Sequence, residues 1–151
     1  MTDPGMKILE LTPRYMDEFP RALEEGVLYI SEECELAAHK CCCGCGEDVI
    51  TPLNPARWRL DRHGECVSLY PSIGNWKFAC RSHYWIRNNR VIQSYRMDDE
   101  EIAEVIELDR IDRENFVTQS QQAPPPTSAQ ASAPKSQHWL ARLYKRLRSG
   151  V

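Results

Sequence analysis

Apolar and polar residues alternate in short runs through the first two thirds of the chain, and turn-forming residues separate these runs. Alternation of this kind predicts β-strands, because successive side chains of a strand point to opposite faces of a sheet. We expect strands at residues 6–13, 27–31, 34–41, 48–53, 57–61, 66–73, 77–86 and 90–95. The turn signals NPA, RHGE, GNW and RNN between the later runs indicate successive hairpins, so the sheet should be mainly antiparallel.

Residues 14–26 interrupt this pattern with helical spacing. Phe19 and Leu23 fall on one face of the expected helix, and Gly26 provides a stop signal. Pro20 limits this helix to a short one, because proline has no N–H to donate within a helix.

The remaining sequence completes the expected domain organisation. Residues 97–116 predict a helix with Ile102 and Ile106 on its apolar face and acidic residues in its first turn, where the helix dipole favours them. We expect residues 1–116 to form one small α+β domain built around a metal site.

Residues 117–137, rich in Pro, Ser and Gln, should be a disordered linker, because they offer almost no apolar side chains to bury. Residues 138–151 predict a short basic amphipathic helix that docks on a partner or on the acidic segment 98–104, more than on a membrane.

Charge and targeting signals narrow the class of protein. The net charge of −3 gives no general attraction to nucleic acid, so we expect no nucleic-acid partner. No signal peptide and no run of about 20 apolar residues is recognisable, which predicts a cytoplasmic protein without a membrane anchor. A reducing compartment disfavours disulfides, and the 7 cysteines cannot all pair, so clustered cysteines indicate a metal site.

The stretch HKCCCGCGEDVI carries the strongest chemical signal. It offers Cys41, Cys43 and Cys45, with a glycine on each side of Cys45 to let the backbone turn sharply. A second segment offers Cys80 and His83 in Cys-x-x-His spacing. Zinc prefers four thiolate or imidazole ligands, which two separate segments usually supply. We therefore predict a Zn²⁺ site drawn from these five residues, although the spacing leaves open which four bind.

The other cysteines and a nearby histidine have simpler interpretations. Cys34 and Cys66 lie in strand patterns and should be small buried hydrophobic residues. Cys42 should point away from an ion held by its neighbours. His39 is an additional ligand, a group that hydrogen-bonds to a ligand or, as is more common for a histidine before such a cluster, simply exposed.

A catalytic zinc site would need an open position for water and a nearby base. Glu47 stands where a general base could lie, and Ser82 could hydrogen-bond a developing oxyanion. The alternatives are a solvated turn carboxylate and a hydroxyl bonded to local backbone. From the residues alone a closed structural site is favoured, because several thiolates weaken the Lewis acidity of zinc.

The turn YPSIGNW offers a further place for chemistry. Ser72 and Asn75 flank Gly74 there, and such a turn could present backbone donors to a peptide carbonyl. A turn that only reverses the chain direction is equally compatible.

The segments HKCCCGCGEDVITPL, RWRLDRHGECVSLYPSIGNW and CRSHYWI together resemble a bacterial family of unknown function. Its genes cluster with those of ubiquitin-activating-like and ubiquitin-conjugating-like enzymes, and the resemblance covers residues 7–95. The family pattern falls on His39, Cys41, Cys43, Cys45, Gly46, Pro71, Ser72, Ile73, Cys80, Ser82 and His83. Cys42 departs from it, because small residues or proline are more usual there.

This resemblance implies a zinc-containing enzyme that cuts a ubiquitin-like protein from its extension or conjugate. We therefore expect a zinc-dependent peptidase or esterase whose partner is a ubiquitin-like protein or its conjugating enzymes. Zinc-bound water would attack, Glu47 would act as the base, and Ser82 or turn amides would hold the oxyanion. The alternative is a zinc-stabilised adaptor in the same pathway that binds without cutting.

Overall fold

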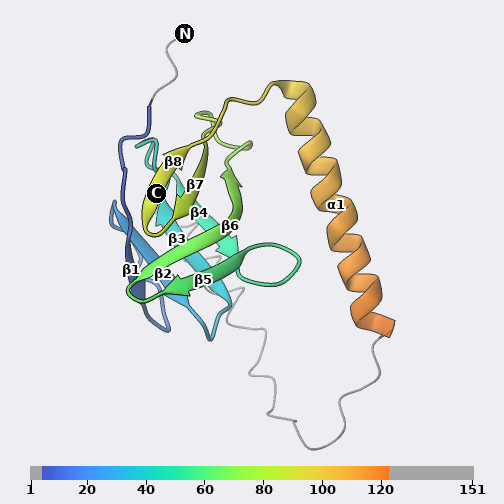
Figure 1. Ribbon diagram of the computed structural model, residues 1–151, viewed down its shortest axis with the longest axis horizontal. Helices are drawn as coiled ribbons and strands as arrows, with labels where there is room; N and C mark the ends of the chain where they lie inside the picture. Colours follow the sequence, from blue (N-terminus) through green and yellow to red (C-terminus); the bar gives the residue numbers. More distant parts are fainter. Residues whose placement is uncertain (1–4, 123–151) are drawn as a thin grey trace, which may run out of the picture.

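The computed structural model describes residues 5–122 of the chain. Within that range it shows two four-stranded sheets and one helix (Figure 1). The first sheet contains β1 (Thr12–Tyr15), β2 (Val27–Ser31), β3 (Leu36–Lys40) and β4 (Asp48–Pro52). The second contains β5 (Arg59–His63), β6 (Cys66–Gly74), β7 (His83–Arg87) and β8 (Arg90–Gln93). The helix is α1 (Asp99–Gln122), so the predicted α+β class is confirmed.

Both sheets follow the chain order, as the hairpin pattern predicted. β2, β3 and β4 pair as antiparallel neighbours, and so do β5, β6, β7 and β8. β1 is the exception, because it pairs with β2 in parallel. Residues 16–26 form the connection that returns the chain to the start of β2.

The helix predicted at residues 14–26 is wrong. The structure places β1 and then irregular turns there. Leu23 is buried beside Tyr29, and Phe19 packs against the same small cluster. The apolar spacing therefore reflects packing on β2, while Pro20 lacks the N–H that a helix would use.

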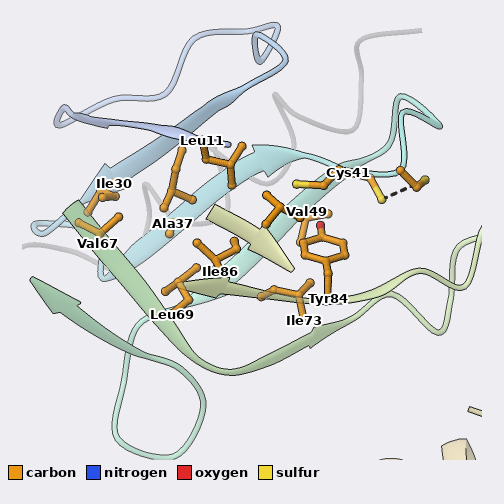
Figure 2. Packing of buried hydrophobic residues seen from close by; sticks show 14 residues of the cluster. Leu11, Ile30, Ala37, Cys41, Val49, Val67, Leu69, Ile73, Tyr84 and Ile86 are labelled. Atoms are coloured by element: carbon orange, nitrogen blue, oxygen red, sulfur yellow. Dashed lines mark hydrogen bonds between the residues drawn. The ribbon is translucent and has the colours of Figure 1, made fainter. Parts of the chain in front are cut away.

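Side chains from the two sheets meet in one shared core (Figure 2). Their burial follows the alternation of the strands, which turns every second side chain toward the facing sheet. Removing each large aliphatic side chain from water stabilises the fold by about 1.5–3 kcal/mol. The fully buried members labelled in Figure 2 include Leu11, Ile30, Ala37, Leu69, Tyr84 and Ile86.

β6 changes its register partway along its length. Leu69 pairs with Ile86, whereas Ile73 pairs with Tyr84, so β6 uses more residues than β7 over the same stretch. Such a β-bulge re-aims the side chains near it. Beyond the bulge, Ile73 enters the core and Ser72 faces the opposite side of the sheet.

α1 begins with a reciprocal cap. The Asp98 carboxylate accepts a hydrogen bond from the Glu101 backbone N–H at 2.9 Å, and the Glu101 carboxylate accepts one from the Asp98 N–H at 2.9 Å. This arrangement satisfies two N–H groups that the first turn leaves without a helical partner. Ile102 then buries its side chain, as predicted, whereas Ile106, expected on the same apolar face, is exposed.

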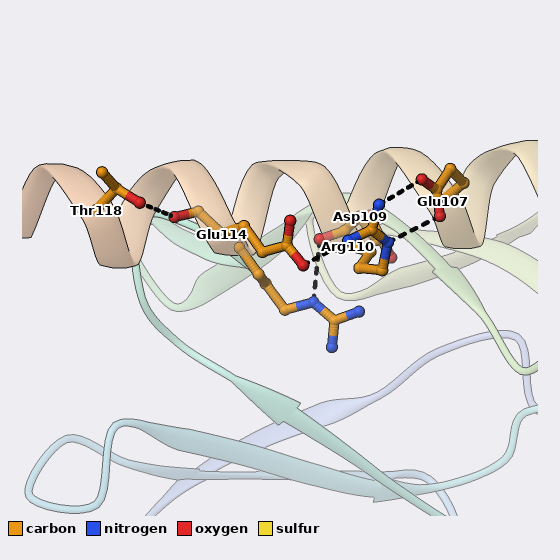
Figure 3. Close-up of polar contacts among 6 residues, drawn as sticks. Glu107, Asp109, Arg110, Glu114 and Thr118 are labelled. Atoms are coloured by element: carbon orange, nitrogen blue, oxygen red, sulfur yellow. Dashed lines mark hydrogen bonds and ion pairs between the residues drawn. The ribbon is translucent and has the colours of Figure 1, made fainter.

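The helix runs past the predicted boundary at residue 116 and extends to Gln122, the last residue that the structure describes. Arg110 pairs with both Glu107 and Glu114 on its surface, and the Thr118 hydroxyl donates to the Glu114 carbonyl at 2.9 Å (Figure 3). Residues 123–151, with most of the predicted linker and all of the predicted tail helix, lie outside the described residues. Among residues 5–122, the helix lacks the apolar length needed to span a bilayer.

Candidate metal centre and serine–histidine pair

Four thiols from two distant segments meet at one end of the core. The turn between β3 and β4 supplies Cys41, Cys43 and Cys45, and the turn between β6 and β7 supplies Cys80. Their sulfur atoms all lie within 4.8 Å of one another. Cys41 is fully buried beside the core, where Figure 2 shows it.

The spacing of these sulfurs fits a tetrahedral ion. Cys41 Sγ lies 3.4 Å from Cys43 Sγ and 3.9 Å from Cys80 Sγ, and Cys45 Sγ lies 3.7 Å from Cys80 Sγ. Four thiolates at about 2.3 Å from a central zinc would lie about 3.8 Å from one another. The cluster could therefore hold a metal ion, and its members are four of the five residues from which the sequence predicted a site.

Backbone geometry explains why the first segment folds around this point. Gly44 and Gly46 adopt φ angles of 82° and 88°, which side chains disfavour. The Gly44 N–H donates to the Cys41 carbonyl at 3.0 Å, and the Cys41 N–H donates to the Glu47 carbonyl at 2.8 Å. These bonds close the turn so that its three thiols point to a common centre.

Thiol acidity differs across the cluster. Burial raises the pKa of Cys43 and of Cys45 above the usual range. Burial also acts to raise the pKa of Cys80, but its hydrogen bonds with Ser82, Cys43 and Cys45 together lower this pKa. A bound cation would favour the deprotonated form of all four thiols.

His83 does not join the thiol cluster, although its Cys-x-x-His spacing made it one of the predicted ligands. Its Nε2 lies 2.9 Å from Ser72 Oγ, and its Nδ1 lies 3.0 Å from the Tyr95 carbonyl oxygen. The ring is buried, with the rings of Trp76 and Tyr95 placed edge-on at 5.1 and 5.6 Å between centroids. Both ring nitrogens thus already have partners away from the sulfurs.

These contacts define the tautomer of His83. A carbonyl oxygen can only accept, so the proton lies on Nδ1 and is donated to Tyr95. Nε2 is then free to accept the hydroxyl proton of Ser72. A hydroxyl, a base within hydrogen-bond reach and a third group that orients the base form the arrangement of an activated serine nucleophile.

The two other candidates for chemistry lie elsewhere. Ser82 Oγ is 3.1 Å from Cys41 Sγ and 3.5 Å from Cys80 Sγ, so it faces the thiol cluster. Glu47 is exposed, and its backbone carbonyl takes part in the cysteine turn.

His39 is fully buried, contrary to the expectation that it is exposed. Its Nε2 lies 2.8 Å from the Tyr84 hydroxyl, and burial lowers the pKa of His39 to about 3, so the ring is neutral. Cys42 is buried outside the cluster, and burial raises its pKa to about 12. Neither residue contributes a ligand atom to the group of four sulfurs.

Comparison with known proteins identifies the family of the chain. Curated proteins and solved structures give no match. Residues 15–94, more than half of the chain, match the family described as "Bacterial ubiquitination-like system serine protease (BubE)". This stretch contains the four clustered cysteines as well as Ser72 and His83. The chain therefore belongs to the family of bacterial ubiquitination-like system serine proteases.

Proposed function

We propose that this protein is a serine peptidase in which Ser72 is the nucleophile and His83 is the general base. The observation that carries this proposal is the 2.9 Å contact between Ser72 Oγ and His83 Nε2, with Nδ1 held by the Tyr95 carbonyl. The family description supports the reaction class. A backbone carbonyl takes the place that a carboxylate occupies in a Ser-His-Asp triad.

The reaction follows from this geometry. His83 Nε2 removes the Ser72 hydroxyl proton as Oγ attacks the scissile carbonyl carbon, and the imidazolium then gives that proton to the leaving group. An acyl ester on Ser72 results. Water, activated by the same imidazole, hydrolyses the ester and returns Ser72 to its starting state. The flanking rings of Trp76 and Tyr95 limit the motion of the imidazole and its contact with solvent.

We further propose that the metal is Zn²⁺ and that Cys41, Cys43, Cys45 and Cys80 hold it. Four thiolates fill a tetrahedron and leave no position for a reactive water, which is typical of a structural site. Cys80 lies three positions before His83, so a bound ion would fix the turn that leads into β7 and would crosslink it to the cysteine turn. Any dependence of the activity on zinc would thus arise because the ion fixes the position of His83. In this mechanism no zinc-bound water attacks the substrate, and Glu47 is not a base.

We infer that the substrate is a ubiquitin-like protein or its conjugate. The support is the family description, which places these proteases in a bacterial ubiquitination-like system. A flexible, extended terminus of such a protein could reach a half-buried serine at the surface of a sheet. A centre built from reduced thiols also fits a cytoplasmic location.

Cleavage of a ubiquitin-like protein from the same system, carrying a short C-terminal extension, tests this proposal. Mass spectrometry would follow the released peptide for the native protein and for Ser72→Ala and Glu47→Gln. We expect Ser72→Ala to lower kcat/KM by about 10³-fold or more, because the nucleophile is lost. We expect Glu47→Gln to cleave normally.

Two results would overturn the proposal. One is normal cleavage by Ser72→Ala together with loss of cleavage in Glu47→Gln, which would indicate a metal-bound nucleophile. The other is binding of the ubiquitin-like protein by the native chain without turnover, which would indicate an adaptor.

A further inference from the structure

A chain of buried hydrogen bonds leads from the core to the thiol cluster. The Asn75 side-chain amide donates to Ser82 Oγ at 3.0 Å, and its nitrogen lies 3.5 Å from Cys41 Sγ. Ser82 Oγ is in turn 3.1 Å from Cys41 Sγ. Asn75, Ser82 and Cys41 are all buried, so water does not compete for these contacts.

The direction of these bonds follows from the available protons. Ser82 has one hydroxyl proton and accepts from the Asn75 amide, so its proton is free to point to a sulfur. Cys41 Sγ at 3.1 Å is nearer to it than Cys80 Sγ at 3.5 Å. Asn75 has a second amide proton, which faces Cys41 Sγ and the Tyr84 hydroxyl, 3.4 Å away. Cys41 thus receives hydrogen bonds from two neutral side chains.

A buried thiolate centre needs such donors. Four thiolates around a divalent ion leave about two negative charges in excess, and burial makes that excess costly. The backbone also fixes the donors in place, because the Asn75 N–H donates to the Ser82 carbonyl at 2.9 Å. Side chains that hydrogen-bond to metal ligands typically change metal affinity by about 10–100-fold when they are removed.

We infer that Ser82 and Asn75 are hydrogen-bond donors to the Cys41 ligand and thereby set the metal affinity and thiolate character of the centre. Ser82 then serves the metal centre and not an oxyanion. The inference rests on the thiol cluster holding a metal and is independent of the role of Ser72 in peptide hydrolysis.

Tyr84 provides a matched control within the same network. Its hydroxyl is hydrogen-bonded with Asn75 and His39, and among the described residues no hydrogen bond joins it to the four clustered sulfurs. Tyr84→Phe therefore removes one buried hydroxyl from the chain of hydrogen bonds and leaves Ser82 beside Cys41. If metal affinity falls only because a buried polar network is disturbed, it should fall in Tyr84→Phe as well.

Titration of the metal-free full chain with Co²⁺ tests the inference without relying on activity. Competition with a chelator gives the affinity, and the thiolate-to-cobalt charge-transfer band reports the electron density on the sulfurs. For Ser82→Ala we expect affinity to fall by about 10–100-fold and the band to move to lower energy. Ser82→Thr should restore both, and Tyr84→Phe should leave the band in place. If Ser82→Ala does not fold, Asn75→Ala replaces it, with the same direction of change.

Native affinity and an unshifted band in Ser82→Ala, or in Asn75→Ala where that variant replaces it, would overturn the inference. An equal band shift in Tyr84→Phe would also overturn it. If the native chain does not bind Co²⁺, the thiol cluster is not a metal site, and the inference is overturned with it. Loss of the serine mechanism would be seen separately, as continued cleavage by Ser72→Ala.

Discussion

Ser72 Oγ lies 2.9 Å from His83 Nε2, although the two residues are 11 positions apart in the sequence. The pairing of β6 with β7 creates this contact, because Gly74 stands opposite His83 and Ser72 is two residues before Gly74 on the same face. The turn between β6 and β7 also carries Cys80, three residues before His83, which meets the cysteine turn. The candidate nucleophile and the candidate metal centre therefore share this turn.

His83→Gln tests the base. We expect kcat/KM to fall by about 10²–10⁴-fold, because glutamine can keep a hydrogen bond to Ser72 but cannot take up its proton. Steady-state cleavage kinetics and thermal unfolding would be measured together. The double variant with Ser72→Ala should be no slower than Ser72→Ala alone, since the two residues act as one unit. If the losses in kcat/KM of the two single variants multiplied in the double variant, the two residues would not act in the same step.

Removal of the metal tests whether the ion joins the cysteine turn to the turn that contains Cys80. We expect the purified native protein to contain about one zinc per chain and to lose stability by several kcal/mol when a chelator removes the ion. Cys45→Ser should lower the metal content, because it removes a ligand. Cys66→Ser is the matched control, because Cys66 is not one of the four clustered cysteines. Elemental analysis and thermal unfolding give both quantities, and a metal-free protein that is fully folded would contradict the account.

Gly74→Ala tests the packing above the histidine. A Cβ at this position would lie 2.4 Å from the Trp76 ring, so the ring would have to move. Trp76 stands edge-on to His83, and we expect its displacement to lower kcat by about 10-fold or more. Trp76→Ala removes the clash, so combining it with Gly74→Ala should add no further loss of stability. A Gly74→Ala protein with native kcat would show that this packing does not position the imidazole.

Ile86→Ala tests the shared core. Ile86 is fully buried between the sheets, and we expect its loss to lower the free energy of unfolding by about 2–5 kcal/mol. Ile92 is 47% exposed, and Ile92→Ala should change that free energy by less than about 1 kcal/mol. Denaturant unfolding of the two variants measures the contrast. Equal losses would mean that the two sheets do not share one core.

The later strands were predictable because apolar and polar residues alternate along them, and the hairpin order that follows from the turn residues between them was confirmed. The strand expected at residues 6–13 lies instead at Thr12–Tyr15, and β2 is buried along its whole length. The helix expected at residues 14–26 failed, because apolar spacing alone does not distinguish a helix from a turn packed on a sheet. Phe19 and Leu23 pack against the cluster around β2 without forming a helical face.

The site was only partly predictable for a related reason. The sequence predicted a site from Cys41, Cys43, Cys45, Cys80 and His83, because close ligand pairs in two segments are typical of zinc, but it left open which four bind. The partner of His83 depends on the β6–β7 register and on the bulge between Leu69 and Ile73, which the sequence does not reveal. The motif that contains Ser72 was a usable signal, but we expected backbone amides of that turn to do the chemistry and not its hydroxyl.

The most direct test of the central claim is covalent labelling of the native protein with a fluorophosphonate, followed by peptide mass spectrometry. An activated serine displaces fluoride from the probe and keeps the phosphonyl group on its oxygen. We predict one adduct per chain at Ser72, with labelling lost in Ser72→Ala and strongly slowed in His83→Gln. An adduct at Ser82, or a folded and metal-loaded chain that cleaves its substrate without labelling at Ser72, would contradict the account.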